Sequence, residues 1–237
     1  GIVHFNSPDN RGIDVALLYQ KKLFQVTSRS THTLKIYDDE TRKRINTRDQ
    51  LLVSGELEGE KMHFIVNHWP SRRGGEARSR PKRVAAAKLN KRIIDSLQSI
   101  DPYAKILTMG DFNDNPGSRS MMFVTGSSQC TFQNIDLRNN NSNVKGTLKY
   151  KANWSYFDQI LVTNSLLRDT SSLYCNPVGG IFDADFLLVP DKKYHGVKIY
   201  RTNIGFRYNG GFSDHLPIYI DLKSNNWSSA LAMICRF

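Results

Sequence analysis

Ala104-Lys-Ile-Leu-Thr-Met-Gly-Asp-Phe-Asn-Asp114 is the stretch that decides the fold prediction for this chain. Its apolar part, residues 104–109, predicts a buried strand, and an acidic segment, residues 110–114, follows directly. A second junction of this kind is Ser213-Asp214-His215, directly before the apolar run 216–222. Side chains at the ends of strands gather at one edge of a sheet. We therefore predict a single site that contains carboxylates, an amide and an imidazole.

Two more predicted strands carry polar residues at one end. Residues 156–162, Tyr-Phe-Asp-Gln-Ile-Leu-Val, have Asp158 near the start, and residues 64–69, Phe-Ile-Val-Asn-His-Trp, bring His68 to the end of a strand. Taken alone, such a histidine or aspartate is more often structural than catalytic, but the four segments together point to one metal-dependent phosphoesterase site.

The remaining pattern predicts strands at both ends of the chain and one long helix between them. In the helix, Ser79 is expected to cap the start, Pro81 to lie in the first turn, and Asp101-Pro102 to end it. Apolar residues at helical spacing should face a sheet; they are Ala86, Leu89, Ile93, Leu97 and Ile100. Further strands are predicted at 12–19, 32–37, 50–57 and 61–67, and loops at 139–145 and 203–211.

Length and composition favour one domain. The chain has 237 residues, of which 39% are hydrophobic, and this is enough for one sizeable core. The mean hydropathy is −0.47 and there is no apolar run of about 18 residues, so no membrane span is predicted. The three cysteines are odd in number and far apart, which excludes a zinc knuckle and a fully paired disulfide framework. The first residues do not resemble a signal peptide, and the cellular compartment stays open.

The chain is strongly basic. Its net charge of +11 and pI near 9.6 predict a surface that attracts polyanions, of which nucleic acid is the commonest. Basic residues are dense over 72–92, where Glu76 is the one acidic residue. For the helical part of this run, with Lys88, Lys91 and Arg92, a solvated helix face is the favoured explanation. Arg72 and Arg73 closely follow His68, so we predict that they bind phosphate.

The chemistry of phosphoester hydrolysis matches these residue types. A hard divalent cation with oxygen ligands neutralises the phosphoryl oxygens and activates water. Asp111 and Asp214 are candidates for a metal ligand and a water-orienting base, and Asn113 is a candidate donor to the phosphate or the water. No two histidines have the close helical spacing of a zinc site, so Mg²⁺ or Mn²⁺ is expected.

The histidines supply the remaining functions. His215 is a candidate hydrogen-bond donor to the charge that develops in the transition state, and Asp158 is a candidate to fix its tautomer. His68 would provide a second donor.

Four motifs in this order resemble the endonuclease/exonuclease/phosphatase superfamily, which includes deoxyribonuclease I. They are Asn67-His68-Trp69, Gly110-Asp111-Phe112-Asn113, Phe157-Asp158-Gln159-Ile160-Leu161-Val162 and Ser213-Asp214-His215. Residues 11–19, Arg-Gly-Ile-Asp-Val-Ala-Leu-Leu-Tyr, and the Trp-Pro-Ser-Arg that follows His68 are similar to a bacterial branch of it. The resemblance implies an α/β (α+β) fold of the DNase I-like type: a two-sheet β-sandwich flanked by helices.

The resemblance also implies a role for each motif residue. Asp111 would orient the attacking water, Asn113 would contact the phosphate, Asp214 would join the metal site, His215 would stabilise the transition state, Asp158 would orient His215, and His68 would contact the phosphate or the leaving group.

The chain also departs from this pattern. Relatives carry a metal-proximal Asn and a metal-binding Glu in strands that would precede this chain, so we expect an N-terminally truncated domain at 1–223 and a tail of unclear origin at 224–237. Glu56, Glu58 and Glu60 lie in or beside a predicted strand and turn and are not plausible replacements. Asp14 is left with two alternatives, an approach to the site or a salt bridge to Arg11.

Three functions remain open. The first is a metal-dependent phosphodiesterase, an endonuclease or exonuclease that acts on nucleic acid. The second is a phosphatase or phospholipase-type hydrolase of a phosphorylated small molecule or lipid headgroup. The sequence indicates no exposed apolar hairpin that would favour a membrane substrate. The third is an inactive anion-binding fragment that lacks the metal-binding Glu.

Overall fold

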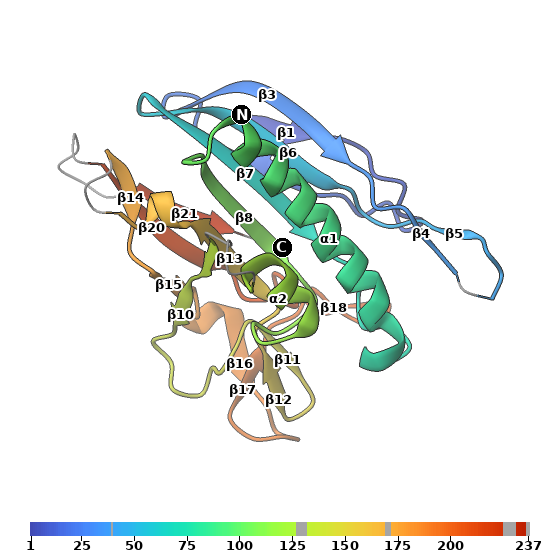
Figure 1. Cartoon of the computed structure of the whole chain (residues 1–237). Helices are drawn as coiled ribbons and strands as arrows, with labels where there is room; N and C mark the ends of the chain where they lie inside the picture. Colours follow the sequence, from blue (N-terminus) through green and yellow to red (C-terminus); the bar gives the residue numbers. More distant parts are fainter. Residues whose placement is uncertain (39, 127–131, 169–171, 225–230, 236–237) are drawn as a thin grey trace.

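Two facing sheets form the body of the protein, and two helices lie on the outer face of one of them (Figure 1). This computed structural model describes residues 1–38, 40–126, 132–168, 172–224 and 231–235, the last of these for its backbone only. The predicted two-sheet sandwich with flanking helices is confirmed.

The larger sheet has six strands in the order β3-β6-β7-β8-β13-β9. Their bounds are β3 (Phe24–His32), β6 (Gln50–Leu57), β7 (Glu60–His68), β8 (Lys105–Asp111), β13 (Asp158–Thr163) and β9 (Phe132–Asn134). The sequence analysis missed β3, because it is an edge strand whose residues are mostly exposed and polar. The predicted strand 32–37 is wrong, since it joins the last residue of β3 to a separate strand, β4 (Ile36–Tyr37).

The central strands are apolar on both faces because both faces are covered. In β8, Ile106 belongs to the core between this sheet and the helices, whereas Leu107 and Met109 belong to the core between the two sheets. In β13, Leu161 lies in the helix-side core and Ile160 in the core of the sandwich. Strands buried on both sides read as continuous hydrophobic runs, which made them easy to predict.

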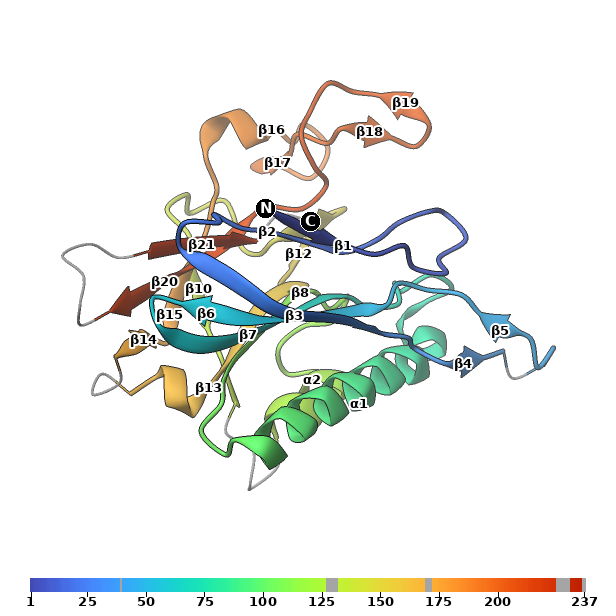
Figure 2. The ribbon, with the colours of Figure 1, turned by 90° about the horizontal axis from the view of Figure 1, so that it is seen from above.

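Helix α1 (Glu76–Ile100) runs along the sheet, with α2 (Arg119–Thr125) beside it (Figure 2). The predicted cap at Ser79 is wrong: the helix begins three residues earlier, and the Ser79 hydroxyl donates to the carbonyls of Gly75 and Glu76. Pro81 consequently lies inside the helix and not in its first turn. The end at Asp101 is confirmed. Ile100 is exposed, contrary to the predicted apolar face.

The second sheet has the order β10-β15-β20-β14, and β21 pairs with β20. Its strands are β10 (Asp136–Arg138), β14 (Leu173–Cys175), β15 (Val178–Ile181), β20 (Ile218–Ser224) and β21 (Leu231–Cys235). Part of the predicted tail thus extends this sheet, while 225–230 and 236–237 lie outside the described residues, as does Cys130.

Among the described residues, five two-stranded antiparallel pairs lie outside the two sheets of the sandwich. They are β1 (Ile2–His4) with β2 (Ala16–Leu18), β4 with β5 (Arg44–Ile45), β11 (Leu148–Tyr150) with β12 (Asn153–Ser155), β16 (Leu188–Pro190) with β17 (Val197–Ile199), and β18 (Asn203–Ile204) with β19 (Arg207–Tyr208). Of the predicted strand 12–19, only β2 is a strand.

The predicted loop 203–211 contains the β18–β19 hairpin, and its apolar side chains are exposed: Ile204 by 58%, Phe206 by 111% and Tyr208 by 72%. The expectation that the protein has no exposed apolar hairpin is therefore wrong. Among the described helices, none is long and apolar enough to cross a membrane.

Candidate active site

The pairing of three central strands brings three predicted site residues to one edge of the larger sheet. β7 is parallel to β8 with His68 opposite Asp111, and β13 is antiparallel to β8 with Asp158 opposite Asp111. His68 and Asp111 end their strands and Asp158 begins its own, so all three lie at the same edge. Register alone therefore places side by side residues that are up to 90 positions apart in the sequence.

His215 reaches this edge from the facing sheet, in the loop before β20. Its Nδ1 donates to Asp158 Oδ2 at 2.7 Å, and the Asp158 side chain is fully buried. Although burial by itself lowers the pKa of His215, the Asp158 carboxylate raises it to about 9. Thr147, which was not predicted from the sequence, links the segments that carry His215 and Asp158. Its backbone carbonyl accepts from Leu216 N at 2.8 Å, and its side-chain hydroxyl accepts from Asp158 N at 3.2 Å.

Asp111 and Asn113 form a compact turn after β8. The Asn113 amide nitrogen of the backbone donates to Asp111 Oδ1 at 2.7 Å, and its side-chain Nδ2 donates to Asp111 Oδ2 and to the Trp69 carbonyl, both at 3.0 Å. Asn113 has a φ of 51°, a left-handed conformation that Asn adopts more readily than most residues. Burial, and then the negative charge of Asp158, raises the pKa of Asp111 to about 7.

His68 lies on the other side of Asp111, with Nε2 3.4 Å from Asp111 Oδ2. Burial, and then the positive charge of Arg48, lowers the pKa of His68 to about 3. The contact is therefore between a carboxyl group and a neutral imidazole, and it is not an ion pair at neutral pH. The two histidines of the site differ in charge as a result: His68 is neutral and His215 is cationic.

Arg48 is a buried cation that the sequence analysis missed. Its Nη2 donates to the Trp69 carbonyl at 2.7 Å, the same oxygen that accepts from Asn113, and its Nη1 donates to Asp9 Oδ2 at 3.1 Å. The side chains of Asp9 and Arg48 are 5% and 3% exposed. Arg48 thereby fixes the turn behind His68 and imposes positive charge on the site.

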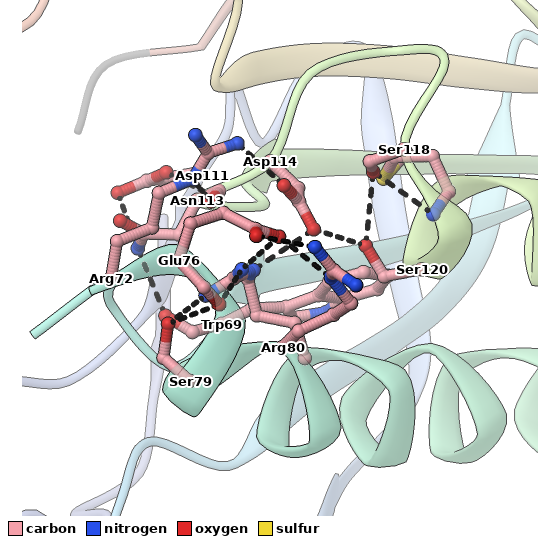
Figure 3. Close-up of polar contacts among 12 residues, drawn as sticks. Trp69, Arg72, Glu76, Ser79, Arg80, Asp111, Asn113, Asp114, Ser118 and Ser120 are labelled. Carbon is pink, nitrogen blue, oxygen red and sulfur yellow. Dashed lines mark hydrogen bonds and ion pairs between the residues drawn. The ribbon is translucent and has the colours of Figure 1, made fainter. Parts of the chain in front are cut away.

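A second buried network supports the Asn113 turn from the helix side (Figure 3). Arg72 lies over the Phe157 ring, donates from Nε to the Asn113 carbonyl at 3.0 Å, and donates from Nη2 to Asp114 Oδ1 at 2.5 Å. Asp114 Oδ2 accepts from Arg83 Nε at 2.9 Å and from the Ser120 hydroxyl at 2.6 Å. Arg72, predicted to bind phosphate, is thus occupied in the structure with positioning this turn.

The other predicted site residues lie outside this cluster. Asp214 is exposed beside His215 and is not part of the group formed by Asp111, Asp158 and His215. Arg73 is exposed and lines a cavity next to the site. Asp14 does not pair with Arg11; it accepts from His4 Nε2 at 3.0 Å, so neither alternative given for it above describes the structure.

Comparison with known families now bears on these residues. A family model described as "Endonuclease/Exonuclease/phosphatase family" matches residues 1–224. The chain belongs to the endonuclease/exonuclease/phosphatase family. This membership places it among phosphoesterases and nucleases, which are mostly hydrolytic enzymes. Comparison with curated proteins gives no match.

Solved structures of the family share the fold at low sequence identity. A mannosyl-6-phosphatase of Bacteroides thetaiotaomicron is 16% identical with a TM-score of 0.58, and covers 94% of this chain and 77% of its own. The human Nocturnin catalytic domain with bound sulfate is 16% identical with a TM-score of 0.54, and the match covers 95% of this chain and 72% of Nocturnin's. Staphylococcus aureus beta toxin with bound magnesium ions is 18% identical with a TM-score of 0.51, and the match covers 82% of this chain and 64% of the toxin's. These likenesses establish the fold alone.

The endonuclease/exonuclease/phosphatase family implies a divalent metal, and the residues at the sheet edge fit one. Ligand atoms of Asp111, Asp158 and His215 lie within 4.8 Å of one another. Asp158 Oδ1 is buried without a hydrogen-bond partner among the described residues, which is costly for a carboxylate oxygen unless a cation binds it. Asp111 and Asp158 therefore offer the hard oxygen ligands that Mg²⁺ and Mn²⁺ prefer. The described glutamates are not part of this group.

Proposed function

We propose that this protein is a Mg²⁺- or Mn²⁺-dependent phosphodiesterase that cleaves nucleic acid. The observation that carries the proposal is the Asp158–His215 pair, which lies beside the Asp111–Asn113 turn at one edge of the sheet. A buried carboxylate that fixes an imidazole, beside a second carboxylate with a perturbed pKa, is the arrangement expected for hydrolysis with acid–base catalysis.

Asp111 is the proposed general base. A base is most effective when its pKa lies near the working pH, and in the metal-free protein burial brings the pKa of Asp111 to about 7. The two bonds from Asn113 fix the orientation of the carboxylate. In this role Asp111 accepts the proton of the attacking water. Both donors of the Asn113 side-chain amide bond to protein oxygens, so its part is to position Asp111; a contact with phosphate would require the side chain to turn.

His215 is the proposed electrostatic catalyst. Because Nδ1 donates to Asp158, Nε2 carries the second proton of the cationic ring and is the atom available to a phosphoryl oxygen. Such a donor stabilises charge that develops in the transition state. His68, neutral and on the opposite side of Asp111, would contact the phosphate or the leaving oxygen.

A bound Mg²⁺ or Mn²⁺ would neutralise charge on the phosphate and lower the pKa of water. Asp111 and Asp158 are the residues proposed to hold it, and the exposed Asp214 is the further predicted ligand at the rim. This assignment places a metal ligand role on Asp158 in addition to its bond to His215.

The charge of the protein supports nucleic acid as the substrate. A net charge of +11 attracts a polyanion along its length, whereas a small phosphate ester requires only a few local cations. The direct test is hydrolysis by the purified chain of single-stranded DNA, duplex DNA and RNA, after chelation and after return of Mg²⁺ or Mn²⁺. We expect activity that chelation removes and that either metal restores. Activity unaffected by chelation would contradict the proposal.

A second function is favoured by one observation, the exposed apolar hairpin β18–β19. Ile204, Phe206 and Tyr208 project from it, and Tyr208 is only seven residues from His215. An exposed apolar patch beside a phosphoesterase site suits a phospholipase-type hydrolase of a lipid headgroup. Vesicles of phosphatidylcholine or sphingomyelin, and a phosphorylated sugar, should therefore be assayed beside the nucleic acids. A folded protein that hydrolyses none of these and binds DNA with steep salt dependence would instead be an inactive anion-binding homologue.

A further inference from the structure

A cavity of about 530 Å³ lies next to the candidate active site. It is open to solvent and is lined by the β4–β5 hairpin, by the loop that follows β7, and by the first turns of α1. In Figure 2 the β4–β5 hairpin lies at the same end of the molecule as the start of α1. None of the residues assigned to hydrolysis above lines this cavity.

The walls of the cavity carry more positive than negative charge. Arg73, Arg78 and Lys82 line it, and their side chains make no hydrogen bond or close ion pair with a described residue, although the charge of Lys82 interacts with the Asp38 carboxylate. The acidic side chains on the wall are Asp38 and Glu40, and the Asp38 carboxylate already accepts three hydrogen bonds from its own turn. Arg73 and Arg78 are therefore the cations of the wall whose side chains have no acidic partner among the described residues, and they are available to an anionic ligand.

The same cavity presents an aromatic ring. Tyr37 lines it from β4 and is 57% exposed, beside the apolar side chains of Ile36 and Ile45. An exposed aromatic side chain next to unpaired cations is the combination by which proteins bind single-stranded nucleic acid: the ring stacks on a base and the cations contact the backbone. Inorganic phosphate or a sugar phosphate would not use the ring in this way.

The cavity adjoins the catalytic edge through the chain itself. Ser71 lines it and is three residues after His68, a span of at most about 11 Å between Cα atoms. Arg48 also lines it, while its Nη2 bonds the Trp69 carbonyl that supports Asn113. A nucleotide in the cavity would thus be a near neighbour of a phosphate held at His68.

We propose that this cavity is a subsite for a nucleotide that flanks the scissile phosphate of a single-stranded nucleic acid. Arg73, Arg78 and Lys82 bind the flanking phosphate. Tyr37 stacks against the base. The inference rests on the proposed function, because it takes the substrate to be a nucleic-acid strand that extends beyond the cleaved bond.

The test is a binding measurement without turnover. Fluorescence anisotropy of a labelled ten-residue oligothymidylate, in EDTA and at several salt concentrations, is compared for the native protein and variants. For Arg78→Ala combined with Lys82→Ala, we expect the slope of log affinity against log salt to become shallower by about 1.4, since each contact to a single strand contributes about 0.7. Tyr37→Ala should weaken binding by about 5- to 150-fold, the equivalent of one stacked base, without changing the slope.

Two controls separate this effect from a change in fold or overall charge. Tyr37→Phe retains the ring and should bind as the native protein does. Arg92→Ala removes a cation from α1 at a position 14 residues, or about 21 Å, beyond Arg78, and should change the slope little. If the cavity variants bind with the native affinity and slope, or if Arg92→Ala has the same effect as they do, the subsite is wrong. Equal binding of duplex and single strand would also contradict it.

Hydrolysis of bis(p-nitrophenyl) phosphate by the native protein with Mn²⁺ is measured separately, because it tests the proposed function and not the subsite. Turnover of this small diester with native oligonucleotide binding in all variants would overturn the subsite alone. Absence of turnover together with the expected binding pattern would overturn the hydrolytic function and leave the cavity as a binding site for one nucleotide of a single strand.

Discussion

Replacement of Asp114 by Asn should destabilise the protein strongly, although Asp114 itself takes no part in the proposed chemistry. Its carboxylate accepts from Arg72, Arg83 and Ser120, and its carbonyl accepts from Gln159 Nε2 at 2.6 Å. The side chains of Arg83 and Asp114 are 0% and 1% exposed. Asp114→Asn keeps the shape and removes the charge, so that Arg83 remains buried with its main counter-ion lost.

The size of the effect follows from that burial. Removal of one partner from a buried ion pair costs about 3–5 kcal/mol. Glu76 lies 3.3 Å from Arg83 Nη2 and compensates in part, but it is 36% exposed and already paired with Arg80. We therefore expect a loss near the lower end, about 3 kcal/mol, out of a total stability of about 5–15 kcal/mol.

Urea unfolding followed by far-UV circular dichroism measures this loss. Asp95→Asn is the matched control, because it breaks the exposed Lys91–Asp95 pair on α1, the helix that carries Arg83, at a cost of about 0.3–0.5 kcal/mol. A loss for Asp114→Asn no larger than that of the control would refute the reasoning.

The pH dependence gives an independent check. Burial raises the pKa of Asp114, but hydrogen bonds from Ser120 and Arg83 outweigh this and leave the pKa below its ordinary value. A carboxyl group whose pKa is lower in the folded state stabilises the protein above its unfolded pKa of about 3.9, and this stability is lost as the pH falls toward the folded pKa. The difference in stability between the native protein and Asp114→Asn should therefore shrink below about pH 4.

Three further predictions concern the site. Asp158→Asn should lower kcat by about 10²–10⁴, because it removes the carboxylate that orients His215 and keeps its imidazole charged. A rate within threefold of the native rate, under saturating metal, would contradict this. Mn²⁺ affinity of the metal-free protein, measured by calorimetry, should fall as the pH decreases below about 7, because Asp111 then takes up a proton that competes with the metal. Between about pH 7 and pH 8 the affinity should change little. Affinity independent of pH between 5 and 8 would be the opposite result. Gly110→Ala should lower the free energy of unfolding, measured in urea, by at least about 3 kcal/mol, because φ at Gly110 is +142° and the new Cβ would lie 2.0 Å from the Asn67 carbonyl oxygen. Gly117 has open space around it, so Gly117→Ala should change the free energy of unfolding little.

The main features of the fold were predictable because local pattern and burial agree in the central strands. The continuous apolar runs that became β8 and β13 lie between two covered faces, so their hydrophobicity is uninterrupted. The edge strand β3 has no such signal, since its outward residues face solvent and its pairing with β6 comes from the backbone. The start of α1 was misplaced because the Ser79 hydroxyl donates to carbonyls instead of accepting from an amide, a choice that only the folded geometry fixes.

The site residues were predicted because they lie at the ends of predicted strands, but the residues that hold them in position were not predicted. The register of β7, β8 and β13 places His68, Asp111 and Asp158 together. That register depends on the order of the strands in the sheet, which the sequence alone does not give. The buried cations Arg48 and Arg83 looked like ordinary surface charges, since their partners Asp9 and Asp114 lie 39 and 31 residues away. Arg72 was expected to bind phosphate from its closeness to His68, yet its contacts are with Asn113 and Asp114.

The measurement that most directly tests the proposed phosphodiesterase is Mn²⁺-dependent hydrolysis of a single-stranded oligonucleotide by the native chain, His215→Ala and His195→Asn. His195 is exposed with a φ of 61°, which Asn tolerates, so that variant controls for the loss of a histidine without disturbing the fold. We predict metal-dependent cleavage by the native protein and by His195→Asn, and a loss of at least about 10² in kcat for His215→Ala. Cleavage by His215→Ala at the native rate would contradict the site proposed around Asp158 and His215.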